Sequence, residues 1–147
     1  MIRRAPLRRR GKFNAHKVIR GGERYDSRME AGYVGWLTML ARVYRLPNEK
    51  PVGWIRQVEV PFDVNGVHIC NYKCDFVIRF ADGHEEWHEV KGFETPEWRL
   101  KERLFRACYP ERILRVFRSN GNGAYYEVLP SRGRNVRRSA KPATRAR

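Results

Sequence analysis

Two turn signals in the middle of the chain divide it into three consecutive β-strands. Asn65-Gly66 is the dipeptide most typical of a two-residue hairpin turn, and Asp82-Gly83 is a second signal of the same kind. The neighbouring segments are rich in the β-branched and aromatic residues that favour strands. These segments are residues 54–64, 67–80 and 86–91. The sequence therefore predicts an antiparallel three-stranded sheet at the centre of the fold, and Pro61 marks its first strand as an edge or bulged strand.

One helix is expected before this sheet and one after it. Ser27 and Glu30 form the Ser-x-x-Glu signature of a helix start, and apolar residues then recur at helical spacing. Thr95-Pro96 begins a second amphipathic helix. Short strands are expected within residues 18–25, 113–117 and 124–129. This order predicts one α+β domain without internal repeats or linkers.

The positive charge is concentrated at the two ends of the chain. The 147 residues carry a formal net charge of +15. Residues 1–20 contain eight Lys/Arg and residues 131–147 contain seven, with no acidic residue in either segment. The remaining 16 basic residues lie between 21 and 130, together with all 16 acidic residues. We therefore expect a domain at 13–130 between disordered basic arms at 1–12 and 131–147, which suits a nucleic acid. Solubility or ribosome association is the alternative use of such arms.

The cysteines and the N-terminus bear on the compartment. The chain has three cysteines, and no apolar run of secretory-signal length follows the basic N-terminal residues. An Arg-rich transit peptide is an alternative, although the segment has a single early alanine and no serine. No stretch is long and apolar enough for a membrane span. A reducing cytoplasm and no membrane partner are expected.

Two acidic residues and a lysine are placed to meet on the central sheet. Glu89 and Lys91 lie two residues apart and so share a strand face, and the paired strand can bring Asp75 beside them. Residues 86–90 alternate, which is typical of a half-buried strand. Carboxylates that are withdrawn from water need a partner, and a hard divalent cation bound through oxygen is one. A surface salt bridge across the strands is the structural alternative.

The order of the elements and several local motifs resemble the PD-(D/E)XK nuclease superfamily. The similarity is closest to the group of phage endonuclease I and the small Holliday-junction resolvases, and it covers about residues 12–118. Cys74 stands where that motif has proline. The matching segments are Tyr25–Ala31, Gln57, Tyr72–Phe76, Glu89–Thr95 and Lys101.

The resemblance implies a restriction-endonuclease-like core with a mixed sheet, and a metal-dependent endonuclease activity. Asp75 and Glu89 would bind Mg²⁺ or Mn²⁺ together with the Val90 carbonyl, and Lys91 would orient or deprotonate the attacking water. The implied substrate is branched DNA such as a four-way junction, and the implied assembly is a homodimer. A phage-encoded protein would act in the cytoplasm of its bacterial host.

Further candidate site residues have both structural and functional interpretations. Glu30 either completes the helix cap or joins the metal site as a ligand or supporting acid, and the resemblance favours the second. Gln57 is a candidate DNA contact, and its amide could pair with the site or with a neighbouring backbone amide. Thr95, at a helix start that attracts phosphate, and Lys101 are the predicted DNA contacts, with Arg99 beside them. The second helix is expected to bury Trp98, Leu100, Leu104, Phe105 and Cys108.

Three other functions remain open from the sequence. A structural zinc site could use His68, Cys70 and Cys74 with His84 or His88 nearby, although the spacing matches no standard zinc motif. A nuclease for transposon ends, mismatches or restriction sites would carry a similar pattern. A non-catalytic basic nucleic-acid-binding protein would keep the acids for structure alone.

Overall fold

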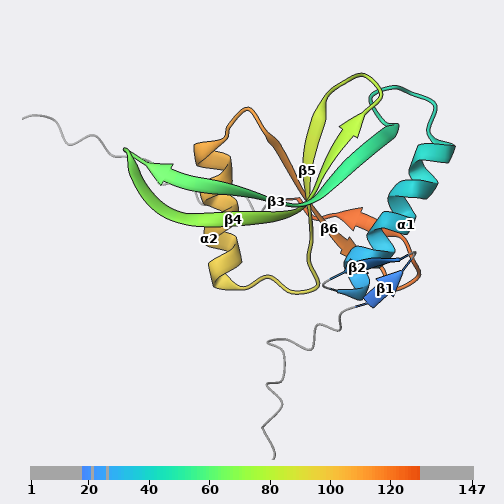
Figure 1. The fold of residues 1–147 in the computed structure, drawn as a ribbon, viewed down its shortest axis with the longest axis horizontal. Helices are drawn as coiled ribbons and strands as arrows, with labels where there is room; N and C mark the ends of the chain where they lie inside the picture. Colours follow the sequence, from blue (N-terminus) through green and yellow to red (C-terminus); the bar gives the residue numbers. More distant parts are fainter. Residues whose placement is uncertain (1–17, 21, 26, 130–147) are drawn as a thin grey trace, which may run out of the picture.

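The computed structural model describes residues 18–20, 22–25 and 27–129, so both predicted basic arms lie outside the described residues. The fold is α+β, as predicted, with two helices and a five-stranded mixed sheet (Figure 1). In chain order the elements are β1 (Val18–Arg20), β2 (Glu23–Tyr25), α1 (Arg28–Val43), β3 (Pro51–Val64), β4 (Val67–Phe80), β5 (Glu85–Val90), α2 (Pro96–Cys108), β6 (Ile113–Ser119) and β7 (Tyr125–Glu127).

The main sheet has the strand order β3-β4-β5-β6-β7, and β1 pairs with β2 as a separate hairpin. β5 and β6 are parallel, whereas the other neighbours are antiparallel. Parallel neighbours need a crossover connection, which α2 provides. The predicted meander β3-β4-β5 is therefore confirmed. β3 is an edge strand with a register shift between Phe62 and Asp63, next to Pro61.

Both predicted helix starts are confirmed by their capping hydrogen bonds. Ser27 Oγ accepts the Glu30 N–H at 3.2 Å. Thr95 Oγ1 accepts the Trp98 N–H at 3.1 Å, and Pro96 is the first residue of α2. These bonds satisfy donors that a helix start otherwise leaves unpaired. They fix where the first turns of α1 and α2 stand relative to the sheet.

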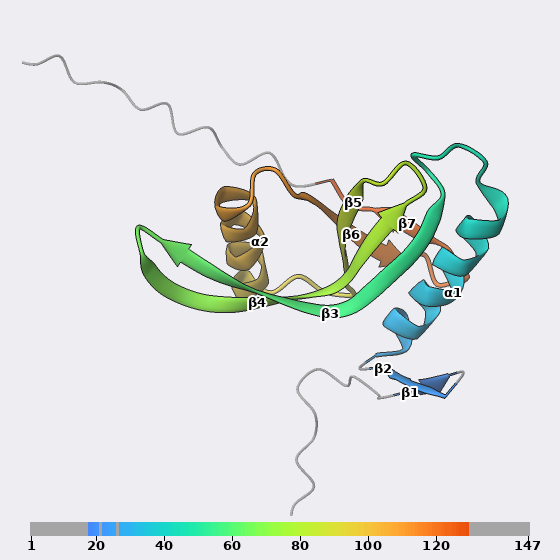
Figure 2. The same ribbon diagram turned by 45° about the horizontal axis from the view of Figure 1, so that its top comes forward.

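The two helices pack against different parts of the sheet (Figure 2). Tyr33 and Leu37 of α1 belong to one buried cluster, and Phe105 of α2 belongs to another. The α1 cluster also contains Phe76, Ile78, Phe80, Val90 and Phe117. The α2 cluster also contains Val60, Phe62, Tyr72, Cys74, Val77, Trp87 and Leu114.

The buried side chains of the β3–β4 hairpin pack with α1 on one side of Gln57 and Asp75, and with α2 on the other side. Phe76 packs in the α1 cluster, whereas Cys74 packs in the α2 cluster. Side chains two residues apart normally share a face, so this reversal requires a local break in strand geometry. On the paired strand at this point, Gln57 has a φ of 56°, in the left-handed region that a side chain disfavours. The pairs that flank it are Arg56–Phe76 and Val58–Cys74.

Two packing predictions are wrong. Residues 86–90 of β5 do not alternate, because all five are buried between the α1 and α2 sides of the sheet. Leu100 is 53% exposed, although it was expected in the core face of α2. It lies about 200° around the helix from Trp98, which is buried, so both cannot face the sheet.

Candidate active site

Two carboxylates meet where β4 and β5 run side by side. Phe76 and His88 form an antiparallel pair. Asp75 precedes Phe76 and Glu89 follows His88, so the two acidic residues lie next to each other on neighbouring strands. The Val90 backbone N–H donates to Asp75 Oδ2 at 2.9 Å. Glu89 is 1% exposed, so its carboxylate is almost fully withdrawn from water. The expectation that Asp75 lies beside the strand of Glu89 is confirmed.

Glu89 is held by two partners of different chemistry. Tyr72 Oη donates to Glu89 Oε2 at 2.7 Å, and the Lys91 ammonium forms an ion pair with Glu89 Oε1. The Lys91 side chain is 26% exposed, and its Nζ lies 5.8 Å from the centre of the Trp98 ring. Glu89 and Lys91 therefore share one face, as their spacing predicts, and Lys91 remains accessible from solvent.

Gln57 connects Asp75 to the first turn of α1. Its Nε2 donates to Glu30 Oε2 at 3.2 Å and approaches Asp75 Oδ1 at 3.5 Å. Glu30 is 8% exposed, and its Oε1 accepts a hydrogen bond from Ser27 Oγ at 3.1 Å. The two interpretations of Glu30 are therefore compatible, because one carboxylate contacts both the helix cap and the residue that reaches Asp75. Left-handed backbone in a non-glycine residue often marks functional sites, and here it belongs to Gln57.

In the protein alone, burial and neighbouring charges shift the pKa values of Asp75 and Lys91. Burial and the adjacent Glu89 carboxylate raise the pKa of Asp75 to about 8, although Lys91 and the Val90 N–H act in the opposite direction. Burial would lower the pKa of Lys91, but Glu89 and Asp75 outweigh it and raise that pKa above its ordinary value. In the protein alone, Asp75 therefore keeps its proton near neutral pH, beside the ion pair of Lys91 and Glu89.

The donor chemistry of this site fits a hard divalent cation. Among the residues that the structure describes, no group of three or more His, Cys, Asp and Glu side chains is arranged to hold a metal ion by itself. The ligand set implied by the resemblance is Asp75, Glu89 and the Val90 carbonyl, with Glu30 as a further ligand or supporting acid, and Gln57 lies between Glu30 and Asp75. An added cation would also compensate the unfavourable charge that raises the pKa of Asp75.

Sequence comparison identifies the family of this chain. A model of the family described as proteins of unknown function, DUF1064, matches residues 10–122. The chain belongs to this family. The match includes every candidate site residue from Glu30 to Lys101. No curated protein and no solved structure matches the chain.

Three of the four predicted DNA-contacting residues of this DUF1064 protein lie at the start of α2, and the fourth, Gln57, lies on β3. Thr95 caps the helix. Arg99 Nε lies 3.4 Å from Glu94 Oε2, and Lys101 Nζ lies 3.3 Å from Glu97 Oε1. Exposed ion pairs of this kind are weak. They therefore leave both basic side chains able to exchange partners.

The candidate zinc ligands are engaged in other contacts. His68 Nδ1 lies 2.8 Å from Asp63 Oδ1 on the exposed part of the β3–β4 hairpin. The Cys74 thiol is buried and approaches the His88 carbonyl oxygen at 3.3 Å. All three cysteines are free thiols. Within the described segments, no helix is long and apolar enough to cross a membrane.

Two interactions of functional interest were missed from the sequence. The first is the Tyr72–Glu89 hydrogen bond, whose only signal is that Tyr72 occupies an inward-facing position on the strand of Asp75. The second is a buried chain in which Tyr33 Oη donates to His88 Nδ1 at 2.7 Å and His88 Nε2 donates to Glu86 Oε2 at 2.7 Å. Burial lowers the pKa of His88, which keeps the imidazole neutral between these partners.

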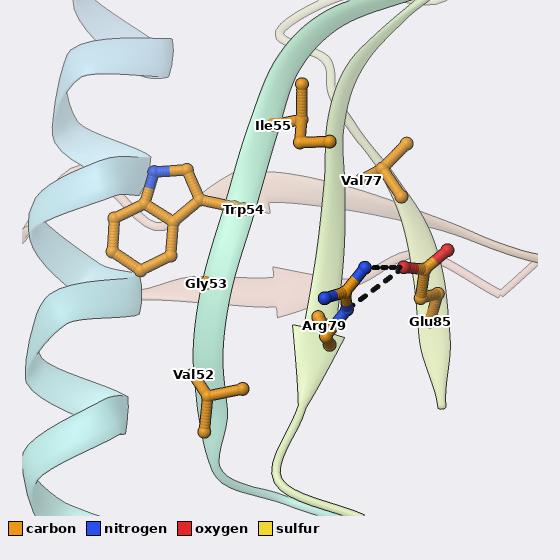
Figure 3. A pocket seen from close by; sticks show the side chains of 7 residues that line it. All are labelled: Val52, Gly53, Trp54, Ile55, Val77, Arg79 and Glu85. Atoms are coloured by element: carbon orange, nitrogen blue, oxygen red, sulfur yellow. Dashed lines mark hydrogen bonds and ion pairs between the residues drawn. The ribbon is translucent and has the colours of Figure 1, made fainter. Parts of the chain in front are cut away.

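A cavity of roughly 310 Å³ is lined by residues of β3, β4 and β5. Figure 3 shows Ile55 and Val77 lining it, beside the ion pair in which Arg79 Nη2 lies 3.0 Å from Glu85 Oε1. Trp54, also part of the lining, extends toward α1 in this view. The cavity includes none of the candidate site residues.

The raised pKa of Asp75 predicts how stability depends on pH. Its pKa is about 8 in the folded protein and 3.8 in its ordinary state, so between these values the folded chain holds a proton that the unfolded chain has lost. Stability from this group is present at low pH and is lost as the pH rises toward 8. Asp75→Asn should therefore raise the Tm of metal-free protein at pH 8 by about 5 °C more than at pH 4.5.

Thermal melts of both proteins at the two pH values, with and without Mg²⁺, check this expectation. Mg²⁺ should stabilise the wild type at pH 8 and have little effect on Asp75→Asn, because the ion binds only the folded site. An equal Tm difference at both pH values would contradict the assigned environment of Asp75.

Proposed function

We propose that this protein is a metal-dependent endonuclease that hydrolyses phosphodiester bonds in DNA. The observation that carries the proposal is that Asp75 and Glu89 lie beside each other on paired strands, with Lys91 paired to Glu89, and that the neighbouring Glu89 carboxylate helps to raise the pKa of Asp75. The order of the elements also agrees with the restriction-endonuclease-like core that the resemblance implies. A protein that only bound nucleic acid would gain nothing from carboxylates that repel phosphate at this position.

The residues divide into three roles. Asp75, Glu89 and the Val90 carbonyl would hold Mg²⁺ or Mn²⁺. When bound, such an ion lowers the pKa of a coordinated water and neutralises charge on the phosphate. Lys91 carries a proton in this environment, so its ammonium orients the attacking water by donating a hydrogen bond. Gln57 and Glu30 fix the Asp75 carboxylate from the side of α1.

Branched DNA is the proposed substrate, and a homodimer is the proposed assembly. Both follow from the resemblance to Holliday-junction resolvases. Two copies would place two sites on two strands of a junction. We also propose that the protein acts in the cytoplasm, which suits its free thiols.

The decisive experiment assays the purified full-length protein on a four-way junction, a flap and a linear duplex. Mg²⁺ should be required for cleavage, and the junction should be cut faster than the duplex. Analytical ultracentrifugation of the same sample reports the oligomer. Binding without cleavage in Mg²⁺ and Mn²⁺ would favour the non-catalytic alternative, and equal rates on all three DNAs would refute the preference for branches.

The basic ends of the chain should supply affinity without selectivity. Deleting residues 1–12 and 131–147 removes six and seven positive charges and leaves a chain whose acidic and basic residues nearly balance. The slope of log K against log[salt] should fall by several units, at about 0.9 for each phosphate that the arms no longer neutralise. Cleavage at low salt and preference for the junction should persist.

Binding titrations over a series of salt concentrations measure this slope. A variant with the same lengths of arm but glutamine at the basic positions separates charge from length. An unchanged slope in both variants would show that the arms do not contact phosphates. Loss of junction preference with cleavage retained would show that they read the substrate.

A further inference from the structure

Phe93 is exposed next to the candidate active site. It lies two residues after Lys91, in the connection between β5 and α2, and is 74% exposed. The other phenylalanines in the described segments are at most 8% exposed. The backbone positions of Lys91 and Phe93 are no more than about 7 Å apart. An apolar ring therefore faces solvent beside the residue that we propose orients the attacking water.

The backbone on the N-terminal side of Phe93 is fixed. The Lys91 N–H donates to the Phe117 carbonyl at 2.9 Å. The end of the Met29 side chain, in the first turn of α1, lies against Gly92, and its Cε is 2.9 Å from where a Cβ of residue 92 would stand.

The C-terminal side of Phe93 is fixed as well. Glu94 Oε1 accepts a hydrogen bond from Arg118 Nη2 at 2.7 Å, and Glu94 is only 17% exposed in its side chain. Thr95 then caps α2. These contacts hold the backbone on both sides of Phe93. The connection thus keeps the position of Phe93 fixed next to Lys91 while its ring stays exposed to a ligand.

The chemistry around the ring matches a nucleobase. Bases stack on aromatic side chains, and flanking cations bind the backbone of the same strand. Lys91 precedes Phe93 by two residues, Arg99 follows it by six, and the Arg99 side chain is 62% exposed. A base can stack on a protein ring only when it is free of its neighbours in the duplex, as it is at a branch point.

We infer that Phe93 stacks on an unpaired or unstacked base at or next to the scissile nucleotide, and so determines preference for branched over linear DNA. This inference rests on the proposed nuclease function and names the side chain that selects its substrate.

The test measures binding of the full-length protein to a four-way junction and to a linear duplex of the same arm sequence, without divalent metal. Phe93→Ala should weaken junction binding by about 10-fold, which is within the range measured when one base–aromatic stack is removed. Duplex binding should change less than about 2-fold, because its bases are already stacked. Phe93→Trp should retain junction preference. Tyr44→Ala is the matched control, because Tyr44 is a 40% exposed aromatic side chain that follows the opposite end of α1 from Glu30.

The outcomes separate this inference from the function on which it rests. Cleavage by the wild type with unchanged junction preference in Phe93→Ala would overturn the inference alone. Junction preference that depends on Phe93, without metal-dependent cleavage, would overturn the nuclease proposal and leave the stacking interaction standing. Dissociation of a dimer by Phe93→Ala, seen by ultracentrifugation, would assign the ring to a second copy of the chain and overturn the inference.

Discussion

Asp75→Ala and Glu89→Ala are each expected to reduce DNA cleavage to background while DNA binding stays equal or becomes tighter. The two carboxylates are the side chains that would hold the metal, so either loss removes the chemistry. The same carboxylates repel the phosphate backbone, so their removal also relieves repulsion at the site. Cleavage assays with Mg²⁺ and equilibrium binding without it measure the two effects separately.

Controls must separate lost chemistry from lost folding. Glu89→Ala leaves the Tyr72 hydroxyl and the Lys91 ammonium without their buried partner, which should cost stability. Glu89→Gln keeps the shape of the side chain and is the cleaner variant, because its amide oxygen can accept from Lys91 while its NH2 donates to the Tyr72 hydroxyl oxygen. Glu85→Ala is the matched control, because this carboxylate lies on the same strand but pairs with Arg79 at the surface. Cleavage at the wild-type rate by Asp75→Asn or Glu89→Gln would refute the site.

Most of the fold follows from local signals in the sequence. The Asn65-Gly66 turn adopts positive φ at both residues, as a two-residue hairpin needs, and it sets the register of β3 on β4. The register of β4 on β5 then places Asp75 next to Glu89. Spacing alone put Glu89 and Lys91 on one face. These features depend on residues close in sequence, which is why they could be predicted.

The remaining features depend on contacts that no local pattern encodes. Gln57 adopts a conformation that glutamine disfavours, opposite the point where the face reversal occurs on β4. Nothing in the residues around Gln57 signals this geometry, because tertiary packing imposes it. The contact of Tyr72 with Glu89 similarly joins two strands across 17 residues. Alternating burial was expected in β5 but is not observed. The sequence of a single strand does not show that helices cover both its faces.

Lys91→Ala is expected to lower the cleavage rate by orders of magnitude while changing the Mg²⁺ concentration for half-maximal activity only modestly. The ammonium pairs with Glu89 and has a raised pKa, so it is positioned to donate a hydrogen bond to water rather than to bind the ion. Loss of the ammonium also leaves the Asp75–Glu89 pair more negative. Any change in Mg²⁺ affinity should therefore be an increase. Single-turnover cleavage over a series of Mg²⁺ concentrations separates the two effects.

The substitution Lys91→Arg distinguishes a positioned donor from a simple positive charge. Guanidinium keeps the charge but differs in shape and hydrogen-bond geometry, so it should restore little of the lost rate. Lys73→Ala, an exposed lysine on β4, is the matched control and should cleave normally. Full activity of Lys91→Ala at high Mg²⁺, or of Lys91→Arg at any Mg²⁺ concentration, would mean that Lys91 only balances the charge of the two acids. In that case the orientation of the attacking water would have to come from another donor at the site, and Gln57, whose amide already reaches Asp75, would be the next residue to substitute.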